Sequence, residues 1–262
     1  MVRARRVSTW ILLRGWTREA RHWGRFPAQL ADAIPMARVV AADLPGNGML
    51  SECASPWSVP ALVDALRASP LPAERPVYLL GLSLGGMAAI EWAHRHPDEV
   101  RGCVLVNASA RPFSPFYRRL RVANYPALAR LILFARDVEA REARILQLTS
   151  AVAPSAALLA DWTRYARERP MKRANALRQV VAAARYRAPL SAPRVPLLVL
   201  ASRHDALVDW RCSEALAQRW QVPLALHPDA GHDLPLDDGP WLAARLREWL
   251  IRSRPCAEST AQ

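Results

Sequence analysis

The stretch from residue 77 to residue 91, VYLLGLSLGGMAAIE, constrains the fold of this chain more than any other. Its first four residues form an apolar run with β-branched and aromatic members, which is typical of a buried strand. From Met87 on, apolar residues recur at helical spacing. Ser83 lies in the turn between them. A serine on so sharp a turn needs a strained backbone and very small residues two positions before and after it, and Gly81 and Gly85 meet that need.

The spacing of Gly81, Ser83 and Gly85 is that of the G-x-S-x-G nucleophile elbow, and on this motif the chain resembles the α/β-hydrolase superfamily. The elbow would raise the Ser83 hydroxyl above the edge of a sheet, at the N-terminus of a helix. There the backbone N–H of Leu84 can point at a developing oxyanion. The alternative reading is an ordinary glycine-rich turn between a strand and a helix, without chemistry.

Apolar runs alternate with helical patterns along most of the chain. The runs predict core strands at residues 9–14, 38–43, 77–80, 100–107, 196–201 and 223–227. Strands and helices that alternate over short links favour a parallel sheet wound with right-handed crossovers. Together with the elbow, this order predicts an α/β-hydrolase fold, in which a mostly parallel central sheet is flanked by helices.

Residues 112–194 differ from the rest because they contain no convincing strand. Four helical stretches are predicted there, at residues 127–134, 138–148, 156–169 and 171–187. In the last of them an apolar face is shared by Leu177, Val180, Val181 and Ala184. The resemblance implies that this insertion is a helical cap or lid. We therefore expect a core formed by residues 1–111 and 195–252, a cap at 112–194, and a flexible tail at 253–262.

Three chemically suitable side chains follow predicted strands. Because the carboxyl ends of parallel strands share one edge, Ser83, Asp205 and His232 are expected to converge there. Their order is that of the superfamily, and the resemblance implies the roles of nucleophile, acid and base. Asp209 rivals Asp205 but is better placed to cap the next helix, and His227 ranks second to His232. Four other acids lie too close to His232 in sequence to orient its ring: Asp229, Asp233, Asp237 and Asp238.

The second oxyanion donor is expected in the turn after the first clear strand, at the backbone N–H of Trp16, beside that of Leu84. Many members of the superfamily have His-Gly before this position, whereas this chain has Arg14-Gly15. Arg14 could pair with an acid near the site or lie on the surface. The side chains of Trp16 and Trp23 are expected to line the substrate pocket or the core. The sequence shows no metal or cofactor motif, and the resemblance implies that none is required.

The composition indicates the size of the core, the absence of a membrane segment and the location of the net charge. A chain of 262 residues that is 52% hydrophobic can bury a large core. Its basic N-terminus has an apolar run only at residues 10–13, which predicts a cytoplasmic protein without stable membrane insertion. The net charge of +13 is uneven. Residues 111–194 hold 17 arginines and lysines against 5 acids, whereas the remainder holds 19 against 18. The charge excess therefore belongs to the predicted cap.

By resemblance, the expected function is hydrolysis of a small-molecule carboxylic ester through an acyl-enzyme on Ser83. The basic cap would attract an acidic partner, which suggests an anionic substrate or one linked to an acidic acyl-carrier protein. A thioesterase or amidase would use the same residues, and a cofactor-free lyase or perhydrolase could use the same scaffold. A noncatalytic binding protein could also retain the fold. Nucleic-acid binding is not expected, because no recognised binding motif accompanies the charge.

Overall fold

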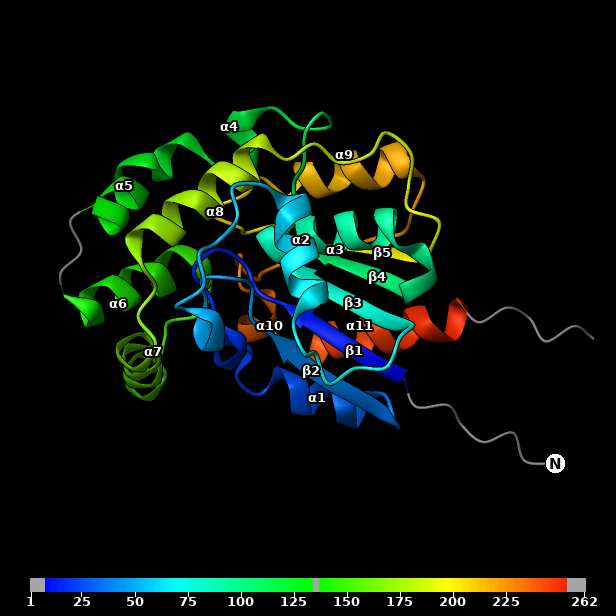
Figure 1. Ribbon diagram of the computed structural model, residues 1–262, viewed down its shortest axis with the longest axis horizontal. Helices are drawn as coiled ribbons and strands as arrows, with labels where there is room; N and C mark the ends of the chain where they lie inside the picture. Colours follow the sequence, from blue (N-terminus) through cyan, green and yellow to red (C-terminus); the bar gives the residue numbers. More distant parts are fainter. Residues whose placement is uncertain (1–7, 134–136, 254–262) are drawn as a thin grey trace, which may run out of the picture.

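The computed structural model describes residues 8–133 and 137–253, which contain one sheet of six parallel strands in the order β2-β1-β3-β4-β5-β6 (Figure 1). The strands are β1 (Ser8–Leu13), β2 (Ala37–Ala42), β3 (Val77–Leu82), β4 (Val100–Val106), β5 (Leu197–Ser202) and β6 (Leu224–His227). Each predicted strand is present, so the predicted fold class is confirmed. Because all strands run the same way, their carboxyl ends lie along one edge of the sheet.

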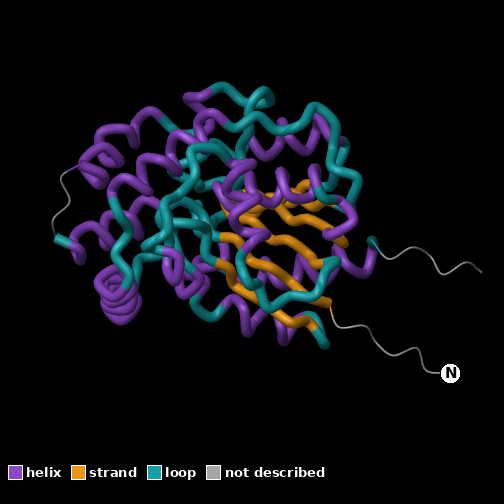
Figure 2. Tube along the Cα trace, in the orientation of Figure 1, coloured by secondary structure: helices purple, strands orange, loops and turns teal. Residues whose placement is uncertain are grey.

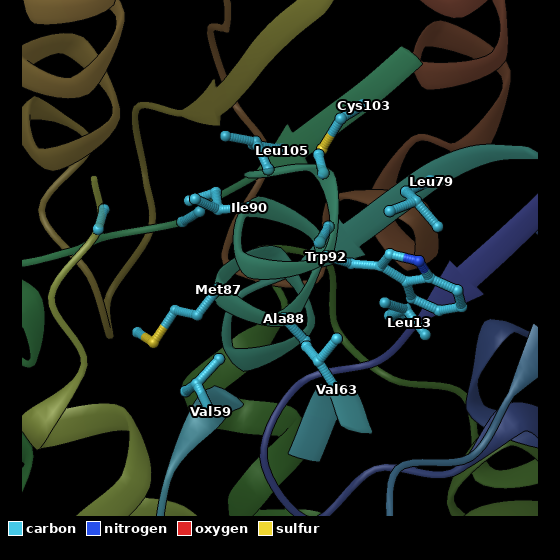
Figure 3. Close-up of a cluster of buried hydrophobic side chains, with 14 of the residues drawn as sticks. Leu13, Val59, Val63, Leu79, Met87, Ala88, Ile90, Trp92, Cys103 and Leu105 are labelled. Atoms are coloured by element: carbon cyan, nitrogen blue, oxygen red, sulfur yellow. The ribbon is translucent and has the colours of Figure 1, made fainter. Parts of the chain in front are cut away.

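Helices cover both faces of the sheet, which explains why the strands read as nearly continuous apolar runs. One face carries α2 (Val59–Ala68), α3 (Leu84–Arg95) and α9 (Arg211–Trp220). The other face carries α1 (Phe26–Ala33) and α11 (Gly239–Arg252), with the short α10 (Leu234–Asp237) beside α11. Figure 3 shows Met87, Ile90 and Trp92 of α3 among side chains from α2 and the strands. This packing fixes α3, and with it the position of Ser83.

The turn between β3 and α3 is sharper than the sequence pattern indicated. We expected the helix to begin near Met87, but α3 begins at Leu84, directly after Ser83. The N–H of Met87 already donates to the Ser83 carbonyl at 3.2 Å. The residues between Ser83 and Met87 therefore form the first helical turn and not a loop, which places the serine at the start of the helix.

Between β4 and β5, residues 112–194 form a helical segment, called the cap below. Its helices are α4 (Phe116–Arg119), α5 (Tyr125–Leu133), α6 (Val138–Thr149), α7 (Ala156–Glu168) and α8 (Arg173–Arg185). A single parallel bridge joins Arg111 to Arg187, so the two ends of the insertion meet. In Figures 1 and 2, α5 to α8 lie together beyond the carboxyl ends of the strands. Phe134, the last residue of one predicted helix, and all of the predicted tail except Ser253 lie outside the described residues.

The prediction for the buried face of α8 was wrong. Leu177 is 48% exposed, and the buried residues are instead Asn175, Ala176, Gln179 and Ala182. The reason is that α8 packs on loops with unpaired backbone groups and not only on apolar side chains. Asn175 donates to the carbonyl oxygens of Ser51 and Cys53 and accepts from the N–H of Ser55. A polar helix face is therefore the buried one.

Four single-turn 3₁₀ helices complete the described elements, at Ala20–Trp23, Gly48–Leu50, Pro97–Glu99 and Val122–Asn124. Cys53 is exposed, and Cys103 and Cys212 are buried, all three as free thiols. Within residues 8–133 and 137–253, no helix combines the length and the apolar character that crossing a membrane requires.

Candidate active site

Ser83 occupies a backbone conformation that serine rarely adopts, with φ 57° and ψ −116°. The two elbow glycines are required by close backbone approaches. A Cβ atom on Gly81 would lie 2.2 Å from the Gly85 carbonyl oxygen, and one on Gly85 would lie 2.1 Å from the Leu13 carbonyl oxygen. Neither position can hold a side chain without moving backbone. The Ser83 N–H donates to the Val106 carbonyl at 3.0 Å, which ties the elbow to the end of β4.

His232 and Asp205 lie 27 residues apart in sequence and form a direct hydrogen bond. The distance from His232 Nδ1 to Asp205 Oδ2 is 2.7 Å, and both side chains are buried. The other carboxylate oxygen of Asp205 accepts from the N–H groups of Leu207 and Val208, at 2.8 and 2.9 Å. A carboxylate with these partners is held in one orientation, so it fixes the tilt and tautomer of the imidazole.

The protonation of His232 depends on opposing effects. Burial of the imidazole favours its neutral form, but the charge of Asp205 and its hydrogen bond outweigh burial. The charge of Asp233 acts in the same direction as Asp205, and that of Arg14 acts against it. The net result is that the pKa of His232 is raised above its usual value.

Two of the three predicted catalytic side chains, Asp205 and His232, are hydrogen-bonded to each other in the structure. Ser83 follows β3, Asp205 follows β5 and His232 follows β6, so all three belong to the same edge of the sheet. Within the part of the chain that the structure describes, the Ser83 hydroxyl and the His232 ring are not hydrogen-bonded. Ser83 remains partly exposed. That Ser83, Asp205 and His232 work together as a catalytic triad is therefore a proposal.

Asn107 holds three parts of this edge together, and sequence reasoning did not single it out. It follows β4 with a positive φ of 48°. Its amide nitrogen donates to the Ser202 hydroxyl and to the carbonyl oxygens of Gly231 and His232, at 3.1, 3.3 and 2.8 Å. Its amide oxygen accepts from the Ser202 N–H at 2.8 Å. The position after β4 on the same edge was the available signal, since asparagine tolerates this left-handed conformation.

Arg14 pairs with Asp233, which settles a question that the sequence left open. The two terminal nitrogens of the guanidinium donate to the two carboxylate oxygens, Nη1 to Oδ1 at 2.8 Å and Nη2 to Oδ2 at 2.6 Å. Both side chains are buried. Arg14 begins the turn after β1, and Asp233 directly follows His232. The pair therefore connects the turn after β1, which holds the predicted oxyanion donor Trp16, to the loop that contains His232, called the histidine loop below.

The turn that follows β1 lies beside Ser83. A Cβ atom on Gly15 would lie 3.2 Å from Ser83 Cβ and 3.7 Å from Ser83 Oγ. Leu84 is the first residue of α3, so its N–H has no carbonyl partner within the helix. Trp16 continues the turn, and its indole N–H donates to the Ala176 carbonyl of the cap at 2.9 Å. The assignment of the Trp16 and Leu84 N–H groups as oxyanion donors stays a prediction.

The two tryptophans proposed for the pocket lie in different environments. Trp16 lines a cavity of about 80 Å³ between the core and the cap. Trp23 is not among the residues that line this cavity. It is buried in the core against Phe26, with the Arg14 guanidinium 5.0 Å from its ring centre. Trp23 therefore packs against the Arg14 guanidinium as part of the core.

The acids that surround His232 in sequence hold its loop and not its ring. Asp237 accepts from the N–H groups of Gly231 and Ala151, at 2.7 and 2.9 Å. The N–H of Asp233 donates to the Thr149 carbonyl at 2.7 Å. Thr149 and Ala151 belong to the cap, so the cap rests directly on the histidine loop.

The alternative residues have structural roles. His227 Nδ1 accepts from the N–H groups of Asp229 and Ala230, and its Nε2 lies 3.1 Å from Asp238 Oδ2. Both ring nitrogens are thus engaged at the end of β6. Asp209 accepts from the N–H of Arg211 at the start of α9, at 3.0 Å. In residues 8–133 and 137–253 no group of three or more His, Cys, Asp or Glu side chains is arranged to hold a metal ion.

Comparison with known proteins agrees with this architecture. The chain is 38% identical over 102 residues to a pimeloyl-[acyl-carrier protein] methyl ester esterase of Chromobacterium violaceum. It is 36% identical over 98 residues to the lipase LipV of Mycobacterium tuberculosis. The first match covers 38% of this chain and 37% of the relative, and the second covers 37% and 36%. The chain thus spans little more than a third of the length of these curated relatives.

A solved structure extends the similarity over nearly the whole chain. The crystal structure of a bacterial membrane phospholipase A superimposes with a TM-score of 0.74, covering 95% of this chain and 80% of that one. At 22% identity this likeness concerns the fold. The model of the alpha/beta hydrolase family matches residues 10–245. Since that match spans both parts of the core and the cap between them, the chain belongs to the alpha/beta hydrolase family.

Proposed function

We propose that the chain is a serine hydrolase that cleaves carboxylic esters through an acyl-enzyme on Ser83. The observation that supports this most is the buried hydrogen bond between His232 and Asp205, on the same sheet edge as a serine held in a strained turn. An unpaired buried carboxylate would be costly, and a histidine fixed by one is suited to take a proton. The named relatives, an esterase and a lipase, are consistent with this chemistry.

The proposed reaction follows from the positions of these groups. Ser83 Oγ attacks the ester carbonyl carbon while its proton passes to His232 Nε2, and Asp205 stabilises the imidazolium through Nδ1. The N–H groups of Trp16 and Leu84 stabilise the oxyanion. His232 then gives the proton to the leaving alcohol, which departs and leaves an acyl-serine. Water activated by His232 hydrolyses this intermediate and frees Ser83.

Labelling with a fluorophosphonate probe tests the proposal. We expect the native chain to react at Ser83, and Ser83→Ala to remain unlabelled. Asp209→Asn is a matched control, because this acid lies near Asp205 in sequence but its carboxylate bonds, among the described residues, only to Arg211 at the start of α9. It should label as the native chain does. Equal labelling of the native chain and Ser83→Ala would contradict a nucleophilic role for this serine.

We further propose that the substrate carries, or is attached to, negative charge, an acidic acyl-carrier protein being one such attachment. The charge distribution supports this, since the excess of 12 basic residues lies in residues 111–194. Such a field raises the rate of encounter with acidic partners, and salt screens it. Several relatives are named as esterases of an acyl-carrier-linked ester.

The rate of hydrolysis tests this part of the proposal. A carrier-linked ester should be hydrolysed faster than its free analogue, and its rate should fall as the salt concentration rises. Equal rates, insensitive to salt, would contradict this part.

A further inference from the structure

The cavity of about 80 Å³ between the core and the cap is lined mainly by polar and charged side chains. One wall is formed by the turns after β1 and β2 and the 3₁₀ helix at Ala20–Trp23, and the other by residues of the cap from α5 to α8. By the volume that one water needs, this space holds about five water molecules or one small polar group. Ser83 and His232 are not among the residues that line this cavity, so the proposed catalysis does not account for its charged lining.

Three buried polar atoms on the wall that contains the turn after β1 have no hydrogen-bond partner in the described chain: Arg18 Nε, Glu19 Oε2 and His22 Nε2. All three residues line the cavity, and Glu19 Oε2 lies 3.8 Å from Arg169 Nη1, within ion-pair distance. They are 8%, 4% and 5% exposed. Buried polar atoms normally find partners, so their grouping around one cavity indicates that something polar fills it.

The tautomer of His22 makes its free nitrogen a donor. The Glu19 carbonyl accepts from the backbone N–H of His22 at 3.0 Å and lies 3.3 Å from His22 Nδ1. The shorter contact of Nδ1 is with the backbone N–H of Glu19, at 3.1 Å, and in it Nδ1 is the acceptor. We assign the tautomer from this contact, which places the proton of the neutral ring on Nε2. Burial, together with the charges of Arg18 and Arg14, lowers the pKa of His22 well below its usual value, so the ring is neutral. With Arg18 Nε, the wall thus offers two free donors.

The charge of the lining is positive. Four guanidinium groups border the cavity, against two carboxylates: Arg18, Arg141, Arg169 and Arg173 against Glu19 and Glu142. Glu142 is bonded to both Arg18 and Arg141, and so is neutralised. Arg173, at the first turn of α8, forms no ion pair with any described residue. The cavity therefore has donors and positive charge in excess, which suits a carboxylate.

Trp16 relates this cavity to Ser83. Its side chain lines the cavity, while its N–H belongs to the turn beside the Ser83 hydroxyl. We propose that the cavity binds a carboxylate on the acyl part of the substrate, which makes half-esters of short dicarboxylic acids the preferred small substrates. This proposal rests on the proposed ester hydrolysis at Ser83. It differs from the attraction of acidic partners by the outside of the cap, because it requires direct contact inside the molecule.

Matched substrates test the proposal. The monomethyl esters of succinate, glutarate and adipate are compared with the analogues in which a neutral primary amide replaces the carboxylate. Since the pairs have nearly the same shape, kcat/KM for the best half-ester should exceed that for its amide analogue at least tenfold. A ratio near one for every pair, with turnover of both members, would overturn the carboxylate site and leave the esterase proposal intact.

Variants locate the contact. Arg173→Gln should reduce the ratio of half-ester to amide kcat/KM to near one, and Arg173→Glu should reverse it in favour of an amine-terminated methyl ester. Arg178→Gln is the control, because Arg178 lies on the same helix over Trp57 and away from the cavity. It should keep the native ratio. A native ratio in Arg173→Glu would overturn the assignment.

A binding measurement separates this proposal from the esterase proposal. Free glutarate should raise the Tm of the native chain and of Ser83→Ala, while glutaramide should not. Arg173→Glu should lose the glutarate effect. If no ester is hydrolysed but glutarate still binds in this way, the carboxylate site stands and the proposed reaction fails. If glutarate and glutaramide shift the Tm equally, the carboxylate site is wrong.

Discussion

Arg14 and Asp233 meet through two charge-assisted hydrogen bonds, with both side chains buried. A buried ion pair adds little to stability compared with apolar residues, but removal of one partner leaves an uncompensated buried charge. The benefit of this pair is therefore geometric. It fixes the turn that holds the predicted oxyanion donor relative to the loop that holds His232, and both must be correctly placed around one reacting carbonyl.

Variants of this pair separate stability from positioning. Arg14→Met and Asp233→Leu alone should each lose about 3–5 kcal/mol of unfolding free energy, since each leaves one charge buried without its partner. The double variant should recover much of this loss, measured by urea unfolding. Its kcat should nevertheless stay at least tenfold below the native value, because the two loops are no longer tied. Recovery of kcat together with stability would show that the pair has no positioning role.

The raised pKa of His232 predicts where activity fails at low pH. In the proposed reaction the imidazole is neutral when it accepts the Ser83 proton, so kcat/KM should fall as the pH drops through the pKa of His232. Because the Asp205 charge raises that pKa against the effect of burial, the midpoint should lie above the ordinary value of 6.5. Asp205→Asn should move the midpoint to lower pH and reduce kcat by roughly 10⁴-fold. A midpoint in the native enzyme below 6.5 would contradict this balance.

At the scale of elements, α8 shows how the cap is attached. Gln179 is fully buried, and its side chain connects two separate turns of the core, one after β1 and one after β2. Its amide oxygen accepts from the Thr17 N–H at 3.3 Å, and its amide nitrogen donates to the Pro45 carbonyl and to Asn47 Oδ1, at 3.2 and 2.9 Å. The turn that contains Trp16 is thus held from both ends, by Arg14 on the core side and by Gln179 on the cap side.

Gln179→Leu should destabilise the protein although it adds an apolar residue to a buried position. The substitution leaves an N–H, a carbonyl and an amide oxygen buried without partners, which costs about 1–3 kcal/mol for each group that water cannot reach. Leu177→Gln on the exposed side of the same helix is the control and should leave the midpoint of urea unfolding unchanged. A stable Gln179→Leu would show that these loops rearrange or admit water.

The strands, the elbow and α8 show what the sequence could and could not predict. The strands and the elbow were predictable, because burial on both faces demands continuous apolar runs and the close approaches at Gly81 and Gly85 demand glycine. The buried face of α8 was not, because its partners are backbone groups of distant loops. Arg14 and Asp233 are 219 residues apart, so no local pattern signals their pairing. Side-chain pairs between loops depend on tertiary structure alone.

At the scale of the whole molecule, the basic cap faces the carboxyl edge of the sheet where Ser83 lies (Figure 1). Charge placed on that side would guide acidic partners toward the site, whereas the same charge spread evenly would not. The location of the charge, and not its total, would produce this guidance. It can therefore be tested by removing equal charge from two different places.

Replacement of Arg118, Arg130 and Arg167 by Gln removes three exposed cap cations that pair with no acid in the described chain. At low salt, kcat/KM for a carrier-linked ester should fall about fivefold, and the difference from the native enzyme should vanish near 0.5 M salt, where screening is strong. The control replaces Arg25, Arg38 and Arg247, which are exposed cations of the core. Because these lie outside the cap, their loss should change kcat/KM less than twofold. Equal effects of the two triple variants would mean that net charge alone governs the encounter.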